Sequence, residues 1–449
     1  MRSDEDTIIA LATAPGRGAV AIIRISGTGV LGIGDILGFA LPEPRMAGVR
    51  NLRDGRVTLD QALVLLFISP SSYTGDLVEL QIHSGKAVYD SVVTALLRQP
   101  GFRYAEPGEF SRRAVLNGRL DLTEAEGVND LVNAETEAQR DLAMRQLGGS
   151  LRGIFEGWAD DLTGLRAHLE AFIDFPDEEI PEDVLAELMT GLSEMTTQMG
   201  EFLDDGRRGE RLREGMRIAV VGPPNAGKSS FVNWLAERDV AIVSAMAGTT
   251  RDIIEVHLNL GGYPVTVADT AGVRDDGDVV EIEGIRRARA WASGADLRVL
   301  VVDAADAEEI DGLGFDLRPG DVVLFNKCDL ATNRRVVPSW AAPGEGCALL
   351  VSVKSGSGMR DVVSLLTGIA RERMEVIDRP VISRSRHRAA LLDGMECIKA
   401  GLDGLRDRIE PEIVAEELRQ AANALGRVTG RVDVEDLLDV VFRDFCIGK

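Results

Sequence analysis

The sequence predicts a chain built from α/β and all-α parts, in which one α/β domain with a mostly parallel sheet is inserted into a discontinuous helical bundle. Three observations predict this fold class. Short apolar runs alternate with Gly and Pro over residues 1–119, apolar residues recur every three or four positions over 120–213 and 374–449, and apolar runs separated by helix-length segments fill 214–373. A single hydrophobic core serves at most about 250–300 residues. The 449 residues therefore predict several domains.

The first part is expected to be a compact α/β domain. The apolar runs 19–26 and 62–69 predict strands, and residues 87–97 predict a helix.

The helical parts of the chain are predicted from the periodicity of their apolar residues. Apolar residues from Leu147 to Phe172 lie on one face of a long helix that Pro176 interrupts, a second stretch covers 181–213, and a third covers 385–445. We expect the helical segments on both sides of 214–373 to form one bundle.

The inserted part contains five strand candidates, at 216–222, 257–269, 297–303, 321–327 and 348–354. Near-continuous apolar runs of this kind are typical of a parallel sheet covered on both faces. The segments between them have the length of helices. The pattern predicts a doubly covered sheet.

Charge and composition exclude several classes of protein. Fifty basic against 73 acidic residues give a net charge of −23, which disfavours broad, unaided binding of nucleic acid. One basic concentration stands out and is expected to be the solvated start of a helix; it comprises Arg379, Arg384, Arg386, His387 and Arg388. No apolar stretch approaches the roughly 20 residues of a membrane span. The amino-terminal segment lacks the pattern of a signal peptide, so we expect a cytoplasmic protein.

The cysteines do not indicate a zinc cage or a disulfide framework. Cys328, Cys347, Cys397 and Cys446 are far apart and lack paired spacing. We expect three of them to be ordinary buried thiols.

Residues 222–229, GPPNAGKS, follow a predicted strand and precede a predicted helix, which is the context of a phosphate-binding loop. Its glycines let backbone N–H groups surround phosphates. Lys228 can reach the β and γ phosphates, and the Ser229 hydroxyl can coordinate magnesium. The motif predicts a nucleoside triphosphate site.

Two further segments predict a magnesium ligand and a γ-phosphate sensor. In residues 244–252, Thr250, or with less support Thr249, can place a hydroxyl on the magnesium. In residues 265–272, the carboxylate of Asp269 can hold a magnesium-bound water while the Gly272 N–H faces the γ-phosphate. These segments predict a switch that changes on hydrolysis.

A fourth segment selects the base. A carboxylate at Asp329, after Asn326 and Lys327, can accept two hydrogen bonds from guanine, whereas adenine offers no such donor pair. Residues 352–354 complete the pocket through a backbone N–H. The order of the four segments predicts guanine-nucleotide binding.

The group that activates water stays open from the residues alone. Val273 follows the Asp-x-x-Gly segment and can neither donate nor accept a hydrogen bond. The carboxylates that follow could orient water, and they are Asp275, Asp276, Asp278, Glu281 and Glu283, beside Arg274.

Along essentially its whole length the chain resembles the bacterial tRNA-modification GTPase family MnmE, also called TrmE. The resemblance is carried by residues 13–27, 107–128, 173–180, 222–230, 248–252, 269–272 and 445–449, the last reading FCIGK. It implies an amino-terminal folate-binding and dimerisation domain over 1–119, helical parts at 120–213 and 374–449, and a Ras-like G domain at 214–373. It also implies a homodimer.

The resemblance further implies a partner and a substrate. With the flavoprotein MnmG, also called GidA, the family adds a carboxymethylaminomethyl or aminomethyl group to the wobble uridine of certain tRNAs. A reduced folate, 5-formyl- or methylene-tetrahydrofolate, supplies the one-carbon unit, and the two proteins form a heterotetramer or larger complex. The acidic charge fits this role if the partner supplies much of the surface for tRNA.

At the nucleotide, the resemblance implies a potassium ion that takes the place of an arginine finger. Its ligands match Asn225, Ser244, Met246 and Thr249, and the water-orienting glutamate matches Glu281. Magnesium is assigned to Ser229 and Thr250. The nucleotide contacts expected for GTP or GDP are Asn225, Ala226, Gly227, Lys228, Ser229, Ser230, Ser244, Ala245, Met246, Ala247, Gly248, Thr249, Thr250, Asp269, Thr270, Ala271, Gly272, Asn326, Lys327, Asp329, Ser352, Val353 and Lys354.

The folate contacts implied by the resemblance are Arg24, Glu79, Arg119 and Lys449. Arg119 stands where the family commonly has Lys, which is not a neutral exchange. The segment 72–80 is one residue shorter than the usual pattern, so the placement of Glu79 depends on where that gap falls. Cys446 matches a functionally important cysteine, and we assign it a catalytic or structural role in the modification site.

Two other classes of function share parts of this pattern. A ribosome-assembly or RNA-binding switch GTPase has the nucleotide segments but has no need of the amino-terminal domain or FCIGK. A structural scaffold has no need of an intact set of nucleotide loops. The sequence therefore favours an enzyme.

Overall fold

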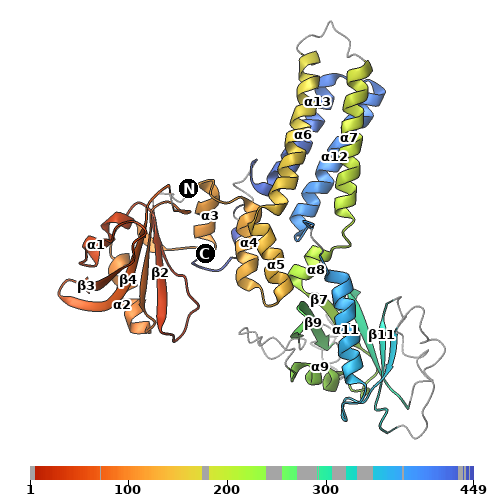
Figure 1. Ribbon diagram of the computed structural model, residues 1–449, viewed down its shortest axis with the longest axis horizontal. Helices are drawn as coiled ribbons and strands as arrows, with labels where there is room; N and C mark the ends of the chain where they lie inside the picture. Colours follow the sequence, from red (N-terminus) through yellow and green to blue (C-terminus); the bar gives the residue numbers. More distant parts are fainter. Residues whose placement is uncertain are drawn as a thin grey trace, which may run out of the picture. The chain divides into compact units, whose positions relative to one another are not determined.

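The computed structural model describes residues 6–70, 72–173, 182–238, 255–269, 291, 293–305, 320–330, 347–376, 379–432, 438, 441–443 and 445–448. The chain divides into two compact units, one of 1–132, 145–197 and 389–449 and one of 133–144 and 198–388 (Figure 1). The fourfold division at 119, 213 and 373 stays a prediction.

The first unit contains a six-stranded sheet in the order β3-β4-β5-β2-β1-β6. The strands are β1 (Thr7–Leu11), β2 (Val20–Ser26), β3 (Gly48–Asp54), β4 (Val57–Phe67), β5 (Leu77–His83) and β6 (Phe102–Tyr104). All neighbours are antiparallel except β1 and β6. Four helical segments complete this domain: η1 (Val30–Gly32), α1 (Ile33–Ile36), α2 (Lys86–Leu97) and α3 (Glu109–Leu116). The predicted helix at 87–97 is confirmed.

The sheet is covered on both faces, because successive residues of β1 are buried although their side chains point to opposite faces. Ile23 and Ile25 pack in the larger core with residues of α2 such as Val93. A smaller cluster contains Leu77 and Phe110, the latter on α3. The side of the sheet that meets α3 carries the polar residues described below.

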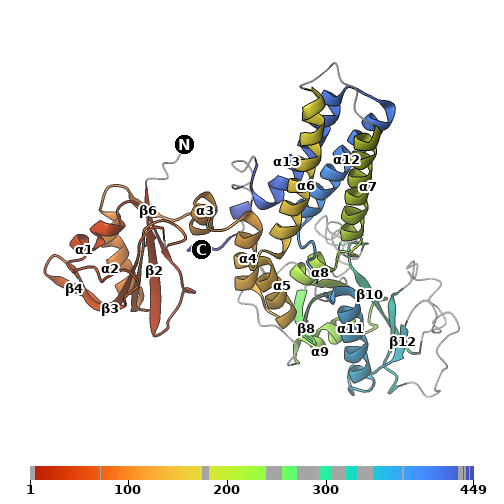
Figure 2. The ribbon, with the colours of Figure 1, turned by 45° about the horizontal axis from the view of Figure 1, so that its top comes forward.

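The helical part of the first unit contains α4 (Leu122–Asn133), α6 (Ser150–Ile173), α13 (Pro411–Thr429) and most of α7 (Glu182–Leu203) and α12 (Ser385–Asp407). Helices α6, α7, α12 and α13 lie side by side in both views (Figures 1 and 2). The predicted helical bundle is confirmed. Its two parts are separated in the sequence by the strands of another domain. The long predicted helix is shorter than expected, because Leu147 ends α5 (Glu137–Leu147) and Gly149, at φ +75°, separates it from α6.

The second unit contains a sheet in the order β12-β11-β10-β7-β9-β8. Its strands are β7 (Met216–Val221), β8 (Glu255–Leu260), β9 (Tyr263–Asp269), β10 (Leu297–Asp303), β11 (Val322–Asn326) and β12 (Cys347–Leu350). All pairs are parallel except β8–β9. The mostly parallel sheet is confirmed, but 257–269 is a hairpin and not one strand. Gly261 and Gly262, at φ +61° and +93°, form its tight turn.

Both faces of this sheet are covered. Ile218 and Val220 lie in one cluster with α9 (Lys228–Ala236) and α11 (Met359–Met374), and Ala219 and Val221 lie in another. The short helix α8 (Arg208–Glu214) precedes β7. The fold class predicted from the sequence is therefore confirmed. Among the described helices, none has the length and apolar character needed to cross a membrane.

The basic segment at 384–388 differs from its prediction as a solvated helix start. His387 is fully buried, and the Arg388 side chain is 14% exposed. Arg388 pairs with Asp205 at 2.7 Å and Glu210 at 3.1 Å. Burial alone would lower the pKa of the Arg388 guanidinium, but its hydrogen bonds to these two carboxylates outweigh burial and raise the pKa. Arg388 therefore joins parts of the second unit instead of facing solvent, whereas Arg379, the first residue of the predicted concentration, is exposed as expected.

Candidate functional site

The phosphate-binding loop follows β7 and ends at the amino terminus of α9, which is the end of a helix that favours an anion. Gly222 has φ +141°, and a Cβ there would clash with the Val301 carbonyl oxygen. At Gly227, with φ +103°, a Cβ would clash with Asn326 Nδ2. Both positions require glycine because backbone or side-chain atoms of neighbouring strands approach closely.

Lys228 is held across this loop. Its Nζ donates to the Gly222 carbonyl at 2.9 Å and to the Pro223 carbonyl at 2.7 Å. The residue is 6% exposed. Asn225 adopts the left-handed region at φ +61° and is exposed, as are Ser229 and Ser230. The loop therefore contains one positively charged side chain that is held in place, Lys228, and three exposed side chains whose oxygen atoms are candidate metal ligands.

Asn326 connects the phosphate-binding loop with the loop after β12. Its Nδ2 donates to the Ala226 carbonyl at 2.8 Å, and the Val353 N–H donates to its Oδ1 at 3.1 Å. The residue is 4% exposed. The sequence predicted Asn326 as part of a base pocket, but its bridging of two loops was not foreseen.

Lys327 is paired with an acid that sequence reasoning missed. Its Nζ lies 2.8 Å from Asp303 Oδ2, and its backbone is left-handed at φ +63°. The Ala305 N–H donates to Asp303 Oδ1 at 3.0 Å. Burial alone would raise the pKa of the Asp303 carboxyl, but the hydrogen bonds from Lys327 and Ala305 outweigh it and the pKa is lowered. Asp303 ends an apolar strand as Asp269 and Asn326 do, and that position was the signal that could have revealed it.

The remaining residues predicted to form the base site lie at the same edge of the sheet. Asp329 and Lys354 are exposed, while Ser352 is fully buried and its Oγ accepts from the Ser355 N–H at 3.2 Å. Ser352 thus shapes its own turn. The predicted contacts at 244–250, 270–272 and Glu281, and the side chain of Asp269, lie outside the described residues.

In the first unit the structure brings Arg24 and Glu79 together. They are register partners on β2 and β5, and Arg24 Nε and Nη2 donate to Glu79 Oε1 at 3.1 and 2.9 Å. Tyr73, which sequence reasoning missed, lies over the guanidinium with 5.8 Å from its ring centroid to Arg24 Cζ. Burial raises the pKa of the Tyr73 phenol, partly opposed by the Arg24 charge. The Arg24 guanidinium therefore lies against an aromatic side chain.

The carboxyl-terminal segment meets the same region. Arg24 Nη1 donates to the Gly448 carbonyl at 3.1 Å. Arg119 Nη2 donates to the Pro70 carbonyl, in the loop that also carries Tyr73. Lys449 lies outside the described residues. Two of the four predicted folate contacts, Arg24 and Glu79, are therefore in direct contact with each other.

The cysteines differ from their prediction. All four are free; Cys347 and Cys446 are exposed, and Cys328 and Cys397 are half-buried. The expectation of three buried thiols is wrong. Cys347 is exposed at the start of β12, which is an edge strand of its sheet, and Cys328 and Cys397 are only half-buried.

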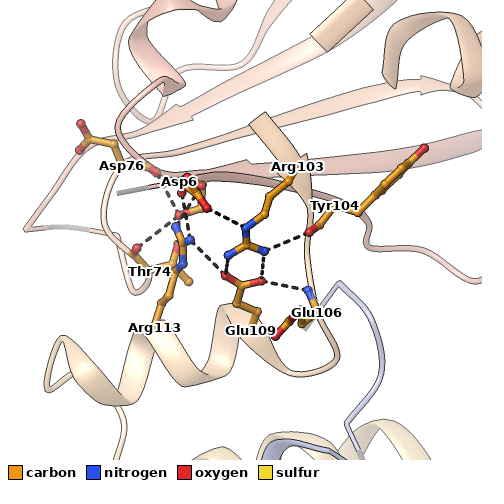
Figure 3. A network of polar contacts seen from close by, with 9 residues as sticks. Asp6, Thr74, Asp76, Arg103, Tyr104, Glu106, Glu109 and Arg113 are labelled. Atoms are coloured by element: carbon orange, nitrogen blue, oxygen red, sulfur yellow. Dashed lines mark hydrogen bonds and ion pairs between the residues drawn. The ribbon is translucent and has the colours of Figure 1, made fainter. Parts of the chain in front are cut away.

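A polar network fixes α3 against β1 and β6 (Figure 3). Arg103 binds Glu109 with two hydrogen bonds, at 2.7 and 2.8 Å, and Asp6 at 3.0 Å. Arg113 adds bonds to Glu109 at 3.1 Å and to the Asp6 carbonyl at 2.9 Å. The hydrogen bonds to Glu109 raise the pKa of the Arg103 guanidinium. A cavity of about 330 Å³ lies beside this network, with Thr74, Asp76 and Arg113 in its lining.

Comparison with known families covers nearly the whole chain. The profile of the GTP-binding protein TrmE N-terminus matches residues 7–119, and the profile of the MnmE helical domain matches 122–446. The chain belongs to the MnmE family. The predicted resemblance is confirmed.

Individual MnmE proteins match over their full length. The tRNA modification GTPase MnmE of Caulobacter vibrioides is 47% identical over 449 residues, covering 99% of this chain and 100% of that protein. The MnmE of Rhodospirillum rubrum is 49% identical over 461 residues, with 99% of each chain covered. Among solved structures, the G domain of the T. maritima FeoB iron transporter aligns with 34% of this chain and 98% of its own, at a TM-score of 0.28 and 21% identity.

Proposed function

We propose that this MnmE family member hydrolyses GTP and, together with MnmG, adds a carboxymethylaminomethyl or aminomethyl group to carbon five of the wobble uridine of certain tRNAs. The observation that carries the proposal is the set of relatives named tRNA modification GTPase MnmE, which match 99% of this chain at 47–49% identity. We further propose that the chain is a cytoplasmic homodimer that joins MnmG in a heterotetramer or larger complex.

The phosphate-binding residues that the structure describes fit a bound GTP. Lys228 is held where it can neutralise the β and γ phosphates, and the amino terminus of α9 can receive them. Ser229 is exposed, and its hydroxyl is a hard oxygen donor of the kind magnesium prefers, so we assign magnesium to Ser229 and Thr250. When bound, the ion would neutralise charge on the phosphates.

We assign potassium to Asn225, Ser244, Met246 and Thr249. Among the described residues, Asn225 fits this role because it combines a left-handed backbone with an exposed side chain that carries an amide oxygen. Potassium would add positive charge where negative charge develops during hydrolysis. Glu281 is proposed to orient the attacking water by accepting its hydrogen bond.

Guanine is proposed to contact Asn326, Lys327, Asp329 and residues 352–354. The exposed carboxylate of Asp329 is available to accept from the guanine N–H groups, while Asn326 holds the surrounding loops in place. A carboxylate in this position rejects adenine because adenine cannot supply both donors.

We assign a reduced folate, 5-formyl- or methylene-tetrahydrofolate, to Arg24, Glu79, Arg119 and Lys449. The pairing of Arg24 with Glu79 fits a ligand that carries both carbonyl and amino groups, because it sets a donor beside an acceptor. A bound folate would supply a one-carbon unit. Cys446, whose side chain is exposed, is proposed to act in the modification site.

The test is genetic and chemical. The gene is deleted and complemented with wild type, Glu281→Ala, Cys446→Ser or the control Asp361→Asn, which changes an exposed residue of α11. Wobble uridine is then measured in digested tRNA by mass spectrometry. We expect the modified uridine to vanish on deletion and to return fully with wild type and the control but not with the other two.

Unchanged wobble uridine in the deletion strain contradicts the proposal and favours a ribosome-assembly or RNA-binding switch GTPase. That alternative predicts ribosomal intermediates in sucrose gradients of the deletion strain, with tRNA left intact. Purified wild-type protein that fails to hydrolyse GTP in potassium and magnesium buffers contradicts the enzymatic part.

A further inference from the structure

Helix α5 packs on the hairpin formed by β8 and β9, although the two are far apart in the sequence. The Ala138 N–H, in the first turn of α5, donates to the Gly262 carbonyl in the hairpin turn at 3.3 Å. Leu142, one turn further along the helix, is 7% exposed and lies in the same hydrophobic cluster as Leu260 of β8 and Val265 of β9. A hydrogen bond and apolar packing therefore attach α5 to the hairpin.

The turn of this hairpin is held in place by its own contacts. The Gly262 N–H donates to Asn259 Oδ1 at 2.8 Å. A Cβ at Gly261 would lie 2.7 Å from Thr367 Cγ2, so the turn also packs closely against α11. Closely packed elements transmit strain to one another. A displacement of the two strands must therefore displace α5 or break its hydrogen bond to the turn.

The start of α5 is rigid and has a second attachment. Thr136 and Gln139 form a capping box, in which the Gln139 N–H donates to Thr136 Oγ1 at 3.3 Å and the Thr136 N–H donates to Gln139 Oε1 at 3.2 Å. Gln139 Nε2 donates to the Arg213 carbonyl, in the last turn of α8, at 3.0 Å. One side chain therefore caps α5 and also ties it to the helix that precedes β7.

The hairpin connects the two segments that are predicted to respond to the nucleotide. β8 begins at Glu255, shortly after the predicted magnesium ligand Thr250, and β9 ends at Asp269. Helix α5 spans the division between the two compact units, since residues 137–144 belong to the second unit and 145–147 to the first. The hairpin therefore connects the predicted switch segments to a helix that ends in the first unit.

We propose that α5 is a relay that transmits nucleotide-dependent movement of the β8–β9 hairpin to the helical part of the first unit. Ala138, Gln139 and Leu142 are its positioning residues, because they act on the nucleotide only through neighbouring elements. Coupling between two equilibria is reciprocal. If GTP in place of GDP shifts α5, loss of the α5 contacts must change the ratio of the affinities for the two nucleotides. The inference rests on the proposed binding of guanine nucleotides.

The test compares the full-length wild-type chain with Gln139→Glu, with Leu142→Ala and with the two changes combined. Gln139→Glu keeps the acceptor of the capping box but places a carboxylate, which has no donor, against the Arg213 carbonyl. Leu142→Ala removes apolar contact with the hairpin. Asp141→Asn is the matched control, because Asp141 is an exposed residue of the same helix.

Calorimetric titration in magnesium and potassium measures the affinities for GDP and for a non-hydrolysable GTP analogue. In the double variant the ratio of the two affinities should change by about fivefold or more, the lower end of ordinary coupling between sites. Gln139→Glu alone, which keeps the apolar core intact, should change the ratio in the same direction by about twofold. The control should keep the wild-type ratio.

Hydrogen exchange, followed by mass spectrometry, locates the effect. In the wild type, exchange over residues 133–154 should differ between the GDP-bound chain and the chain bound to the analogue. In the double variant this difference should vanish over 145–154 and remain over 255–269, since the hairpin still responds but is no longer coupled to α5.

The outcomes separate the relay from the proposed function. An unchanged affinity ratio in the double variant overturns the relay, as does wild-type exchange over 133–154 that is the same with both nucleotides. Loss of the difference over 255–269 as well as over 145–154 also overturns it, because the variant then disturbs the hairpin itself. A wild-type chain that binds neither nucleotide refutes the proposed function together with the relay. Normal GTP hydrolysis without any response of α5 refutes the relay alone.

Discussion

The carboxylate of Asp303, at the end of β10, lies 2.8 Å from the Nζ of Lys327, which follows the neighbouring strand β11. The two strands are parallel, and Asp303 is in register with Asn326, so the acid lies one residue from its partner across the sheet. The pairing fixes the lysine stem at the edge where the guanine base is proposed to bind. We therefore propose that Asp303 is a positioning residue for the proposed base site.

Asp303→Asn should weaken binding of GDP by about two- to fivefold, the range expected for a partly exposed ion pair. Titration of a fluorescent GDP analogue measures the affinity, and Asp361→Asn on α11 is the control. Because the pKa of the Asp303 carboxyl lies below its ordinary value of 3.8, the ion pair is fully formed above that value and is lost only as the pH falls through the depressed pKa. The ratio of wild-type to variant affinity should accordingly be constant from about pH 9 to pH 6. A ratio that changes over this range contradicts the assignment.

Asn326→Ala removes a buried hydrogen bond to the Ala226 carbonyl and a part-buried hydrogen bond from the Val353 N–H. Each unsatisfied buried group costs about 1–3 kcal/mol, so the second unit should unfold at a lower temperature even without nucleotide. Differential scanning fluorimetry with and without GDP measures this effect. Asn233→Ala, at an exposed position of α9, should leave the midpoint unchanged. A variant that loses GDP binding but keeps the wild-type midpoint would make Asn326 a base contact and not a connector.

Gly222→Ala should abolish nucleotide binding. The added Cβ would clash with the Val301 carbonyl oxygen, which is fixed in strand β10, so the phosphate-binding loop must move. Gly16→Ala is the matched control, since Gly16 has φ +137° and open space around it. Calorimetric titration with GDP distinguishes the two. Wild-type affinity in Gly222→Ala would show that the loop tolerates the shift.

The parts of the nucleotide site that depend on local pattern could be predicted from the sequence. Asn326 and Lys228 were placed correctly at a strand end and a helix start, because a parallel sheet brings such positions to one edge. The hairpin at 257–269 was interpreted as one strand although the Gly261–Gly262 pair is a strong turn signal. The sequence therefore contained the signal for the turn, but the apolar residues on both sides of the glycine pair favoured the interpretation as one strand.

Other features could not be predicted, because they depend on residues far apart in the chain. The basic segment at 384–388 was expected to face solvent, yet Arg388 meets Asp205 and Glu210, which lie 183 and 178 residues away. The requirement for glycine at 448 arises from the carbonyl of Leu11. A local sequence pattern cannot predict such contacts, because the fold of the whole chain brings the distant residues together.

Arg388 and its two carboxylate partners, Asp205 and Glu210, give the last prediction. Arg388→Met leaves the carboxylate of Asp205, itself 4% exposed, without its cation, and breaking a buried pair in this way costs about 3 kcal/mol. The thermal transition of the second unit should fall by about 6 °C or more. Arg406→Met is the control on the same helix, because that side chain is 58% exposed.

A double-mutant cycle identifies the cause of that loss. Asp205→Asn removes the charge that Arg388→Met leaves uncompensated, so the combined variant should be clearly more stable than the sum of the two single losses predicts. Hydrogen exchange in α8 and at the start of α12 should follow the same order, since Glu210 and Arg388 belong to those helices. Strict additivity of the two losses would mean that Arg388 stabilises this region through packing of its stem and not through its charge.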